Sequence, residues 1–169
     1  MNTAGLINPR TLHWLIAASI GLAFATGHAM TFPNQINITL LRLHLGFGFL
    51  GGILALVRLA IWFVAGPPPR VFAEQAAVLE IGSKLVHGLL RLVPIVLLVS
   101  GAGMLVVSGA APLILAGTAP DPAQLAQVPP RNLHHLAAAI LLFLIVLHSG
   151  AALWHWLAGH KPITKLTAE

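Results

Sequence analysis

Long stretches without any charged residue are the feature that most restricts how this chain can fold. Three of them lie between Arg10 and Arg42, between Arg91 and Asp121, and between Arg131 and Lys161. A fourth apolar segment, residues 40–64, contains Arg42 near its start and Arg58 near its end. Each segment can hold a helix of about 20 residues, which is the length that crosses the hydrocarbon core of a bilayer. Only 8% of the residues are charged, against about 25% in a soluble domain, so a soluble fold is excluded.

We therefore predict an all-α fold, an integral membrane four-helix bundle formed by a single domain over residues 1–169. The helices are expected at about residues 11–30, 40–64, 85–107 and 133–157. A transmembrane barrel would need strands of alternating polarity, whereas these segments are apolar on all sides. Three successive prolines, 67–69, end the second helix because they cannot continue its hydrogen bonding. Further prolines indicate an irregular third loop: Pro120, Pro122, Pro129 and Pro130.

The first apolar segment has one alternative interpretation, a cleaved signal peptide. Arg10 precedes it, and Ala23 and Ala25 bracket a site of the small-residue type that signal peptidases cleave. The apolar stretch continues past Thr26, however, and removing it would leave three spans. We therefore favour a transmembrane helix.

The distribution of Lys and Arg predicts the orientation. With four spans, both termini lie on one side of the membrane, together with the second loop. That side carries most of the cations outside the spans: Arg10, Arg70, Lys84, Lys161 and Lys165. The positive-inside rule then predicts that both termini are cytoplasmic. The formal net charge of +5 is spread according to this topology and forms no basic stripe, so we expect no nucleic-acid partner.

The chain has no cysteine and nine histidines. The absence of cysteine excludes covalently attached c-type haem, thiolate-ligated iron–sulfur clusters and thiol catalysis. Any iron or other metal would therefore be held mainly by imidazoles.

His134 and His148 stand fourteen residues apart in the last apolar segment. Fourteen residues turn a helix by roughly 1400°, which leaves the two side chains about 40° apart on one face and about 21 Å apart along the axis. His135 fails this test, because it lies about 140° from His148. Ionisable groups inside a membrane helix mark functional sites. The spacing indicates two metal centres stacked across the bilayer.

Helix direction places the histidines at two depths. The outer level holds His44 and His134, and the inner level holds His13, His148 and His87. A bis-imidazole haem needs two histidines from facing helices at one depth, so the simplest pairs are His44–His134 and His13–His148. His87 is the competing inner ligand. Glycines after His44, at positions 46, 48, 51 and 52, would leave room for a flat macrocycle, although small residues also allow close helix packing without any cofactor.

Arginines near these two levels are further candidates for binding a cofactor or a lipid. Arg42 and Arg131 would pair with haem propionates, because a guanidinium matches a carboxylate in bidentate geometry; snorkelling to the interface is the alternative. Arg58 and Arg91 lie at the inner level, where a propionate, a quinone carbonyl or a lipid phosphate would satisfy them. His155 and His160 are expected at the inner interface, and His28 has a possible position beside the outer haem.

Taken together, these residues resemble the prokaryotic cytochrome b561 family, which is related to the cytochrome b subunits of nickel–iron hydrogenases and formate dehydrogenases. The similarity runs from about Pro9 to Lys161. The matching segments are Leu12-His13-Trp14, then His44 with Gly48 and Arg58, then His87 with Ser100-Gly101, and finally His134 and His148 with Ala151-Ala152-Leu153 and His155. Where the family often has a tyrosine this chain has Arg91, and it contains no tyrosine.

The resemblance implies two b haems, ligated by His13–His148 and His44–His134, and electron transfer across the bacterial inner membrane with ubiquinone as a partner. One branch is similar to superoxide oxidase, which oxidises superoxide at the outer face. Other branches are membrane anchors that exchange electrons with a periplasmic redox protein such as a dehydrogenase or hydrogenase. His87 is left over once the inner pair is made, so we expect the quinone beside it, with Arg91, Arg58 and His155 nearby. The outer level, with His28 and His135 as spare imidazoles, suits an aqueous partner.

Two alternatives remain. In the first, the chain is a haem-bearing structural subunit that is inactive without its partner, because its soluble parts are short. In the second, it is a non-haem transporter that uses histidines as zinc or copper ligands. Such a transporter would need acidic residues along its path, and the expected spans contain no Asp or Glu.

Overall fold

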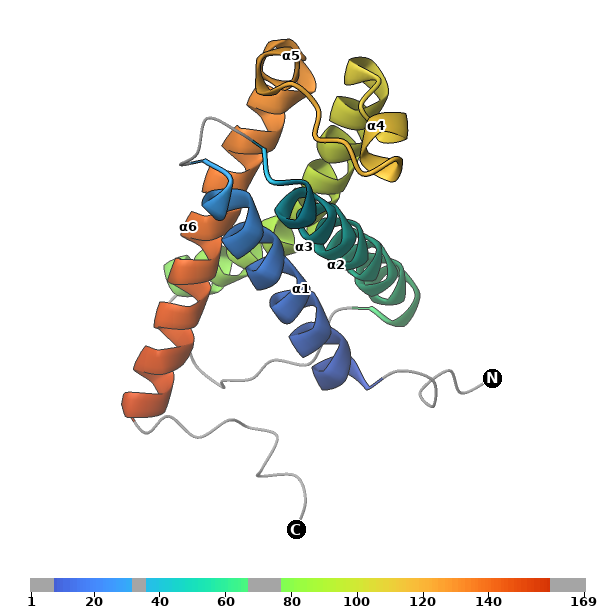
Figure 1. Ribbon diagram of the computed structural model, residues 1–169. Helices are drawn as coiled ribbons and strands as arrows, with labels where there is room; N and C mark the ends of the chain where they lie inside the picture. The colour runs from blue at the N-terminus through green and yellow to red at the C-terminus, as the bar shows by residue number, and fades with distance from the viewer. Residues whose placement is uncertain (1–7, 32–35, 67–76, 159–169) are drawn as a thin grey trace.

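The computed structural model describes residues 8–31, 36–66 and 77–158. Within these residues the chain forms only helices, and four of them are long and apolar enough to cross a membrane. The helices are α1 (Pro9–Ala29), α2 (Ile38–Ala65), α3 (Ala77–Ser108), α4 (Ala111–Leu115), α5 (Pro122–Gln127) and α6 (Pro130–Leu157) (Figure 1). The all-α fold with four membrane helices is therefore confirmed. Arg70, His160, Lys161 and Lys165 lie outside the described residues, as do the prolines at 67–69.

Side-chain caps explain where the first two helices begin. The Asn8 side chain accepts a hydrogen bond from the backbone N–H of Arg10 at 2.9 Å. The Asn37 side chain accepts from the backbone N–H groups of Thr39 and Leu40 at 2.9 and 3.1 Å. Asparagine caps of this kind satisfy N–H groups that have no partner inside the helix. At the other end of α2, Gly66 has a φ of 80°, a conformation that favours glycine.

The third long helix begins earlier than we predicted, at Ala77 instead of about residue 85. Its first turns mix apolar residues with two charged ones, which form an ion pair between Lys84 Nζ and Glu80 Oε1 at 2.9 Å. A helix of 32 residues is about 48 Å long, whereas the hydrocarbon core is about 30 Å thick. The first turns can therefore extend beyond the apolar layer, and a boundary drawn from hydropathy alone misses them.

The third loop is more ordered than we predicted. It contains α4 and α5, so the prediction of an irregular loop was wrong for these two segments. Pro112, Pro122 and Pro130 occupy the first turns of α4, α5 and α6. Proline is suited to the start of a helix because no backbone donor is needed there. These prolines therefore start helices in this loop.

The long helices pack in the order α1, α2, α3, α6, and α1 and α2 approach α6 far less closely than α3 does. The buried cluster between α3 and α6 consists of Val93, Ala137, Leu141 and Leu144. Ile20 and Phe24 of α1 pack against this cluster. Apolar side chains therefore fill the middle of the space between α1 and α6.

The beginning of α1 and the end of α6 lie at the same end of the bundle, and α4 and α5 lie at the opposite end (Figure 1). We call these the terminal end and the loop end. At the loop end, Leu41, Ala110 and Ile114 form a second buried cluster that holds α4 against the start of α2. The cytoplasmic position of the termini stays a prediction.

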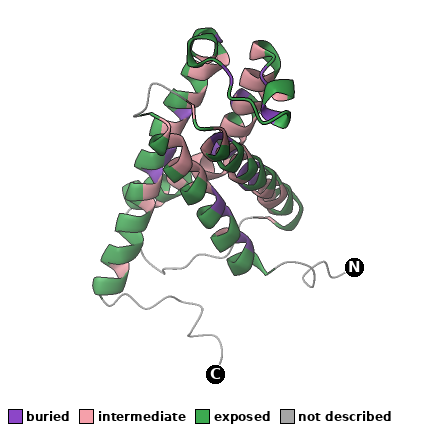
Figure 2. Ribbon diagram, viewed as in Figure 1, coloured by how far each residue is buried: buried purple, intermediate pink, exposed green. Residues whose placement is uncertain are grey.

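Most residues of the long helices are exposed on the outside of the bundle (Figure 2). They include large apolar side chains such as Trp14, Phe63 and Val106, which are 70%, 72% and 80% exposed. In water this surface would drive aggregation. In a bilayer it meets lipid tails, so the surface agrees with a membrane-spanning bundle.

Gly52 generates a prediction about helix packing. A Cβ atom at this position would lie 2.7 Å from Leu98 Cβ on α3, whereas a Cβ at Gly21 would meet no described atom within 4 Å. We expect Gly52→Ala to destabilise the bundle by about 1–3 kcal/mol, because overpacking forces the helices apart. Thermal unfolding of the detergent-solubilised protein, followed by circular dichroism, measures the effect. Gly21→Ala is the control, and equal melting temperatures for the two variants would contradict the packing shown here.

Candidate functional site

The structure brings together both histidine pairs expected from helix depth. At the loop end, the ring centroids of His44 on α2 and His134 on α6 are 6.1 Å apart. At the terminal end, those of His13 on α1 and His148 on α6 are 6.3 Å apart. Two metal–imidazole bonds of about 2 Å each, plus the two half-rings, span roughly 6 Å. Both pairs therefore have the spacing that one metal atom between two imidazoles requires. His135, in contrast, is exposed.

Hydrogen bonds at the loop end leave the Nε2 atoms of both histidines available as ligands. His44 Nδ1 donates to the backbone oxygen of Ala23 at 2.8 Å. His134 Nδ1 lies 3.0 Å from Ser100 Oγ, and that hydroxyl donates to the oxygen of Val96 at 2.7 Å. Because the serine hydrogen is used in this way, His134 Nδ1 is the donor to Ser100 Oγ. Metal-bound histidines almost always make such a bond with their second nitrogen.

Glycines shape the space around the loop-end pair. A Cβ at Gly27 would come within 3.0 Å of the His44 ring, and one at Gly101 within 3.3 Å of the His134 ring. At Gly48, one turn beyond His44, a Cβ would meet no described atom within 4 Å. A hollow opens beside the pair, with an almost entirely apolar lining: His44, Leu45, Gly48, Phe49, Leu97, Leu98, Gly101, Ala102 and His134. The loop-end pair therefore combines two imidazoles with glycine-rich, apolar surroundings, which is the environment that a flat apolar macrocycle requires.

The terminal-end pair fits in spacing but differs in its hydrogen bonds. Arg58 Nη1 on α2 lies 2.9 Å from His13 Nδ1. A guanidinium can only donate, so His13 Nδ1 accepts, and in a neutral ring the proton is then on Nε2. An Nε2–H group cannot bind a metal. His13 would therefore act as an iron ligand only after Arg58 turned to another acceptor, for which a haem propionate is suited.

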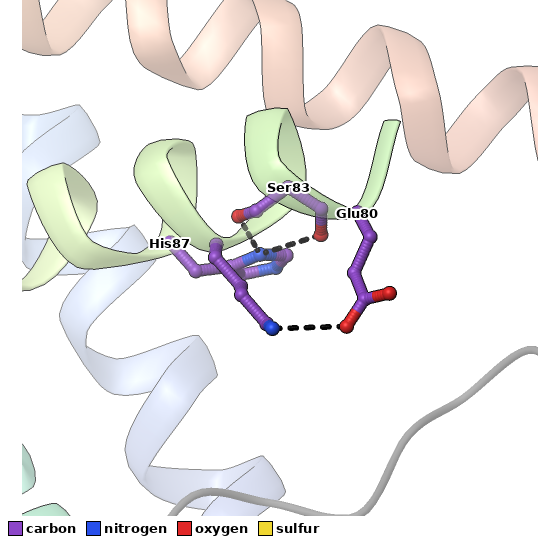
Figure 3. A network of polar contacts seen from close by, with 4 residues as sticks. Glu80, Ser83 and His87 are labelled. Carbon is purple, nitrogen blue, oxygen red and sulfur yellow. Dashed lines mark hydrogen bonds and ion pairs between the residues drawn. The ribbon is translucent and has the colours of Figure 1, made fainter. Parts of the chain in front are cut away.

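His87 is close to the terminal-end pair, with its ring centroid 5.2 Å from that of His148. Its Nδ1 donates to the backbone oxygen of Ser83 at 2.7 Å and lies 3.2 Å from Ser83 Oγ (Figure 3). Figure 3 shows both contacts converging on one nitrogen of the exposed His87 ring. A neutral His87 therefore offers Nε2 as an acceptor, and it donates from that atom only when protonated.

Arg91 is held next to His87. Its Nη1 donates to the backbone oxygen of His87 at 3.2 Å, and its guanidinium carbon lies 5.5 Å from the centre of the Trp62 ring. Cation–π contacts of this kind are favourable, and more so away from water. His155 lies half-buried two turns beyond His148 on α6, towards the terminal end. The predicted quinone residues therefore belong to one end of the bundle.

Arg42 has a structural role that the sequence did not reveal. Its Nε and Nη2 atoms donate to the backbone oxygen of Ile114 at 3.1 and 2.7 Å, and Nη2 also donates to that of Leu115 at 3.0 Å. These carbonyls lie at the end of α4, where the oxygen of Ile114 also accepts from the backbone N–H of Gly117 at 3.1 Å. Arg131 lies half-buried in the first turn of α6. Contacts of either arginine with a haem propionate stay predictions.

The sequence analysis named Ser100 only as part of a family match and gave neither Ser100 nor Ser83 a contact with a histidine. A serine inside an otherwise apolar span is a signal that could have pointed to a hydrogen-bonding role for Ser100. The Ala23 carbonyl that binds His44 has no signature in the sequence. Among the described residues, no group of three or more histidine, aspartate and glutamate side chains could hold a single metal ion.

Comparison with known proteins identifies the family. The model of the prokaryotic cytochrome b561 family matches residues 9–166. No curated protein and no solved structure matches the chain. The matched range includes all four long helices and both histidine pairs. The chain therefore belongs to the prokaryotic cytochrome b561 family, whose members are multi-pass bacterial membrane cytochromes that bind haem b and transfer electrons.

Proposed function

We propose that this protein is a di-haem cytochrome that transfers electrons between a partner at the loop end and ubiquinone at the terminal end. The observation that carries the proposal is the presence of two imidazole pairs, 6.1 and 6.3 Å between ring centroids, which share α6. The α6 members are fourteen residues apart, or about 21 Å along the axis. When bound, two b-type haems would supply one-electron carriers at the two depths.

At the loop end, His44 and His134 are the proposed iron ligands. Their Nδ1 atoms already have oxygen partners, which orients both rings before any cofactor binds. Arg131 is the proposed propionate partner at this end. Arg42 would share that role only in addition to its bonds to the end of α4.

At the terminal end, His13 and His148 are the proposed iron ligands, and Arg58 is the proposed propionate partner. The 2.9 Å contact between Arg58 and His13 supports the nearness of the two groups. In the haem-bound protein Arg58 would move from His13 Nδ1 to a carboxylate, which binds a guanidinium more strongly than a neutral imidazole does.

We place ubiquinone beside His87, with Arg91 and His155 as further contacts. His87 is the third imidazole at the terminal end and is 5.2 Å from His148 between ring centroids. With Nδ1 donating to Ser83, Nε2 can take a proton from a quinol hydroxyl or, once protonated, give one to a quinone oxygen. Imidazole suits this exchange because it changes charge near physiological pH.

The proposed orientation has both termini in the cytoplasm and the loop end in the periplasm of the inner membrane. The balance of cations outside the spans supports it. The loop-end partner would then be a periplasmic redox protein or superoxide. Arg131 would favour an anion electrostatically. Turnover of superoxide by the isolated cytochrome in liposomes would support the second partner.

A second candidate function is that of a haem-bearing anchor subunit for a periplasmic dehydrogenase or hydrogenase. It is favoured by α4, which lies outside the four long helices and exposes Leu113 and Leu115 at 42% and 83%. Purification from native membranes under mild conditions separates the two functions. A stoichiometric periplasmic partner would favour the anchor, and superoxide oxidation without any partner would favour the independent cytochrome.

The ligand assignment predicts which variants lose which haem. Replacing His44 or His134 with alanine should remove one and the same haem, and replacing His13 or His148 should remove the other, because each iron needs both imidazoles. A pyridine haemochrome assay, together with redox-difference spectra, measures this. His135→Ala is the matched control and should keep both haems. Loss of a haem from His87→Ala would overturn the terminal-end pair, and fewer than about one haem in the parent protein would count against haem ligation altogether.

The quinone assignment predicts that His87→Ala keeps both haems and slows electron exchange with ubiquinone. The expected loss is about 10²–10⁴-fold if His87 exchanges the proton. Stopped-flow mixing of the reduced protein with a short-chain ubiquinone measures the rate. His135→Ala again serves as the control, since it removes a surplus imidazole from the other end. An unchanged rate in His87→Ala would move the quinone site elsewhere.

A further inference from the structure

We propose that Ser100 is a positioning residue for the loop-end haem: it holds His134 with the proton on Nδ1 and so keeps Nε2 as the ligand nitrogen. This inference rests on the proposed role of His134 as an iron ligand. It adds a residue on α3, a helix that contributes no ligand of its own to either proposed pair.

The contacts of Ser100 support this role. The side chain is only 3% exposed, and its hydroxyl donates to the oxygen of Val96 at 2.7 Å. Serines in membrane helices often make such a bond to the preceding turn, and Ser108 makes one to the oxygen of Met104 at 2.6 Å. Ser100 differs because its oxygen also receives a hydrogen bond from a histidine on another helix, at 3.0 Å.

The neighbour of Ser100 restricts the same ring. A Cβ at Gly101 would lie 3.3 Å from His134 Cε1, so the backbone of α3 passes close to the imidazole. The hydroxyl of Ser100 and the bare backbone at Gly101 thus contact the Nδ1–Cε1 side of the ring. Nε2 of His134 is not among the ring atoms within 4 Å of that Cβ position, and His134 itself lines the apolar hollow.

The terminal end shows the opposite arrangement. There, Arg58 donates to His13 Nδ1, which leaves no lone pair on Nε2 of a neutral ring. Ser100 therefore gives His134 the ligand tautomer in advance, whereas His13 needs a rearrangement to reach it. An acceptor on Nδ1–H also raises the basicity of the ligand nitrogen. A more basic ligand stabilises ferric iron relative to ferrous iron and lowers the midpoint potential of that haem.

The variant Ser100→Ala tests this, with Ser19→Ala as the control, because Ser19 is a similarly buried serine on α1. Two readouts are needed: the rate of haem transfer to apomyoglobin, and a potentiometric titration of the two haems. We expect Ser100→Ala to hold the loop-end haem about 10–100-fold more weakly and to move one of the two redox components to a more positive potential. Ser19→Ala should leave the haem-transfer rate and the two potentials unchanged.

The possible results separate this inference from the proposed function. Potentials and transfer rates in Ser100→Ala equal to those of Ser19→Ala would overturn the role of Ser100. A lower melting temperature in Ser100→Ala with both potentials unchanged would also overturn it, because it would mean a packing role only. His134→Ala provides the second arm. If His134→Ala kept both haems, the assignment of His134 as an iron ligand would fail. If His134→Ala lost one haem while Ser100→Ala kept the parent potentials and transfer rates, only the role of Ser100 would be refuted.

Discussion

The apolar interior of a membrane leaves no water to satisfy polar side chains, so every imidazole placed there needs a partner from the protein or from a cofactor. In this protein the need is greatest along α6, which carries His134 and His148 towards α2 and α1. The backbones of α1 and α2 stay away from α6, and the imidazole pairs bridge the space at two depths. Between them lies an apolar layer that includes Ile20, Phe24 and Leu141. That layer keeps the two imidazole pairs apart in so small a bundle.

The two ends of the bundle differ in the polar groups that surround the histidine pairs. At the loop end, both histidines donate from Nδ1 to neutral oxygens, and the space beside them is apolar. At the terminal end, Arg58, Arg91 and His87 add two cations and a further imidazole to the pair. Such groups exchange protons and bind polar oxygens, which haem ligation alone does not require. A proton-coupled partner such as quinone therefore suits the terminal end, and a simple electron donor or acceptor suits the loop end.

The four long helices and the nearness of the histidine pairs were predictable, because both follow from span length and from the 3.6-residue period of a helix. The start of α3 was misjudged, since Glu80 and Lys84 interrupt the apolar pattern although they lie inside the helix. The hydrogen-bond partners of the histidines could not be predicted from the sequence, for a different reason. The Ala23 carbonyl has no side-chain signature, and the contact between Arg58 and His13 joins residues 45 positions apart. The hydrogen bond from Arg42 to the oxygen of Ile114 depends on how the third loop folds, which the sequence pattern does not give.

In the proposed function, two bis-imidazole haems lie at two depths along α6. Low-temperature electron paramagnetic resonance of the oxidised protein, combined with haem quantification on the same sample, tests it most directly. We expect two haems per chain, two distinct low-spin ferric signals and no high-spin signal in the parent protein, with a single low-spin signal left in His44→Ala and in His13→Ala. One haem per chain, or a high-spin signal from the parent protein, would contradict it, because one of the two histidine pairs would then not ligate iron.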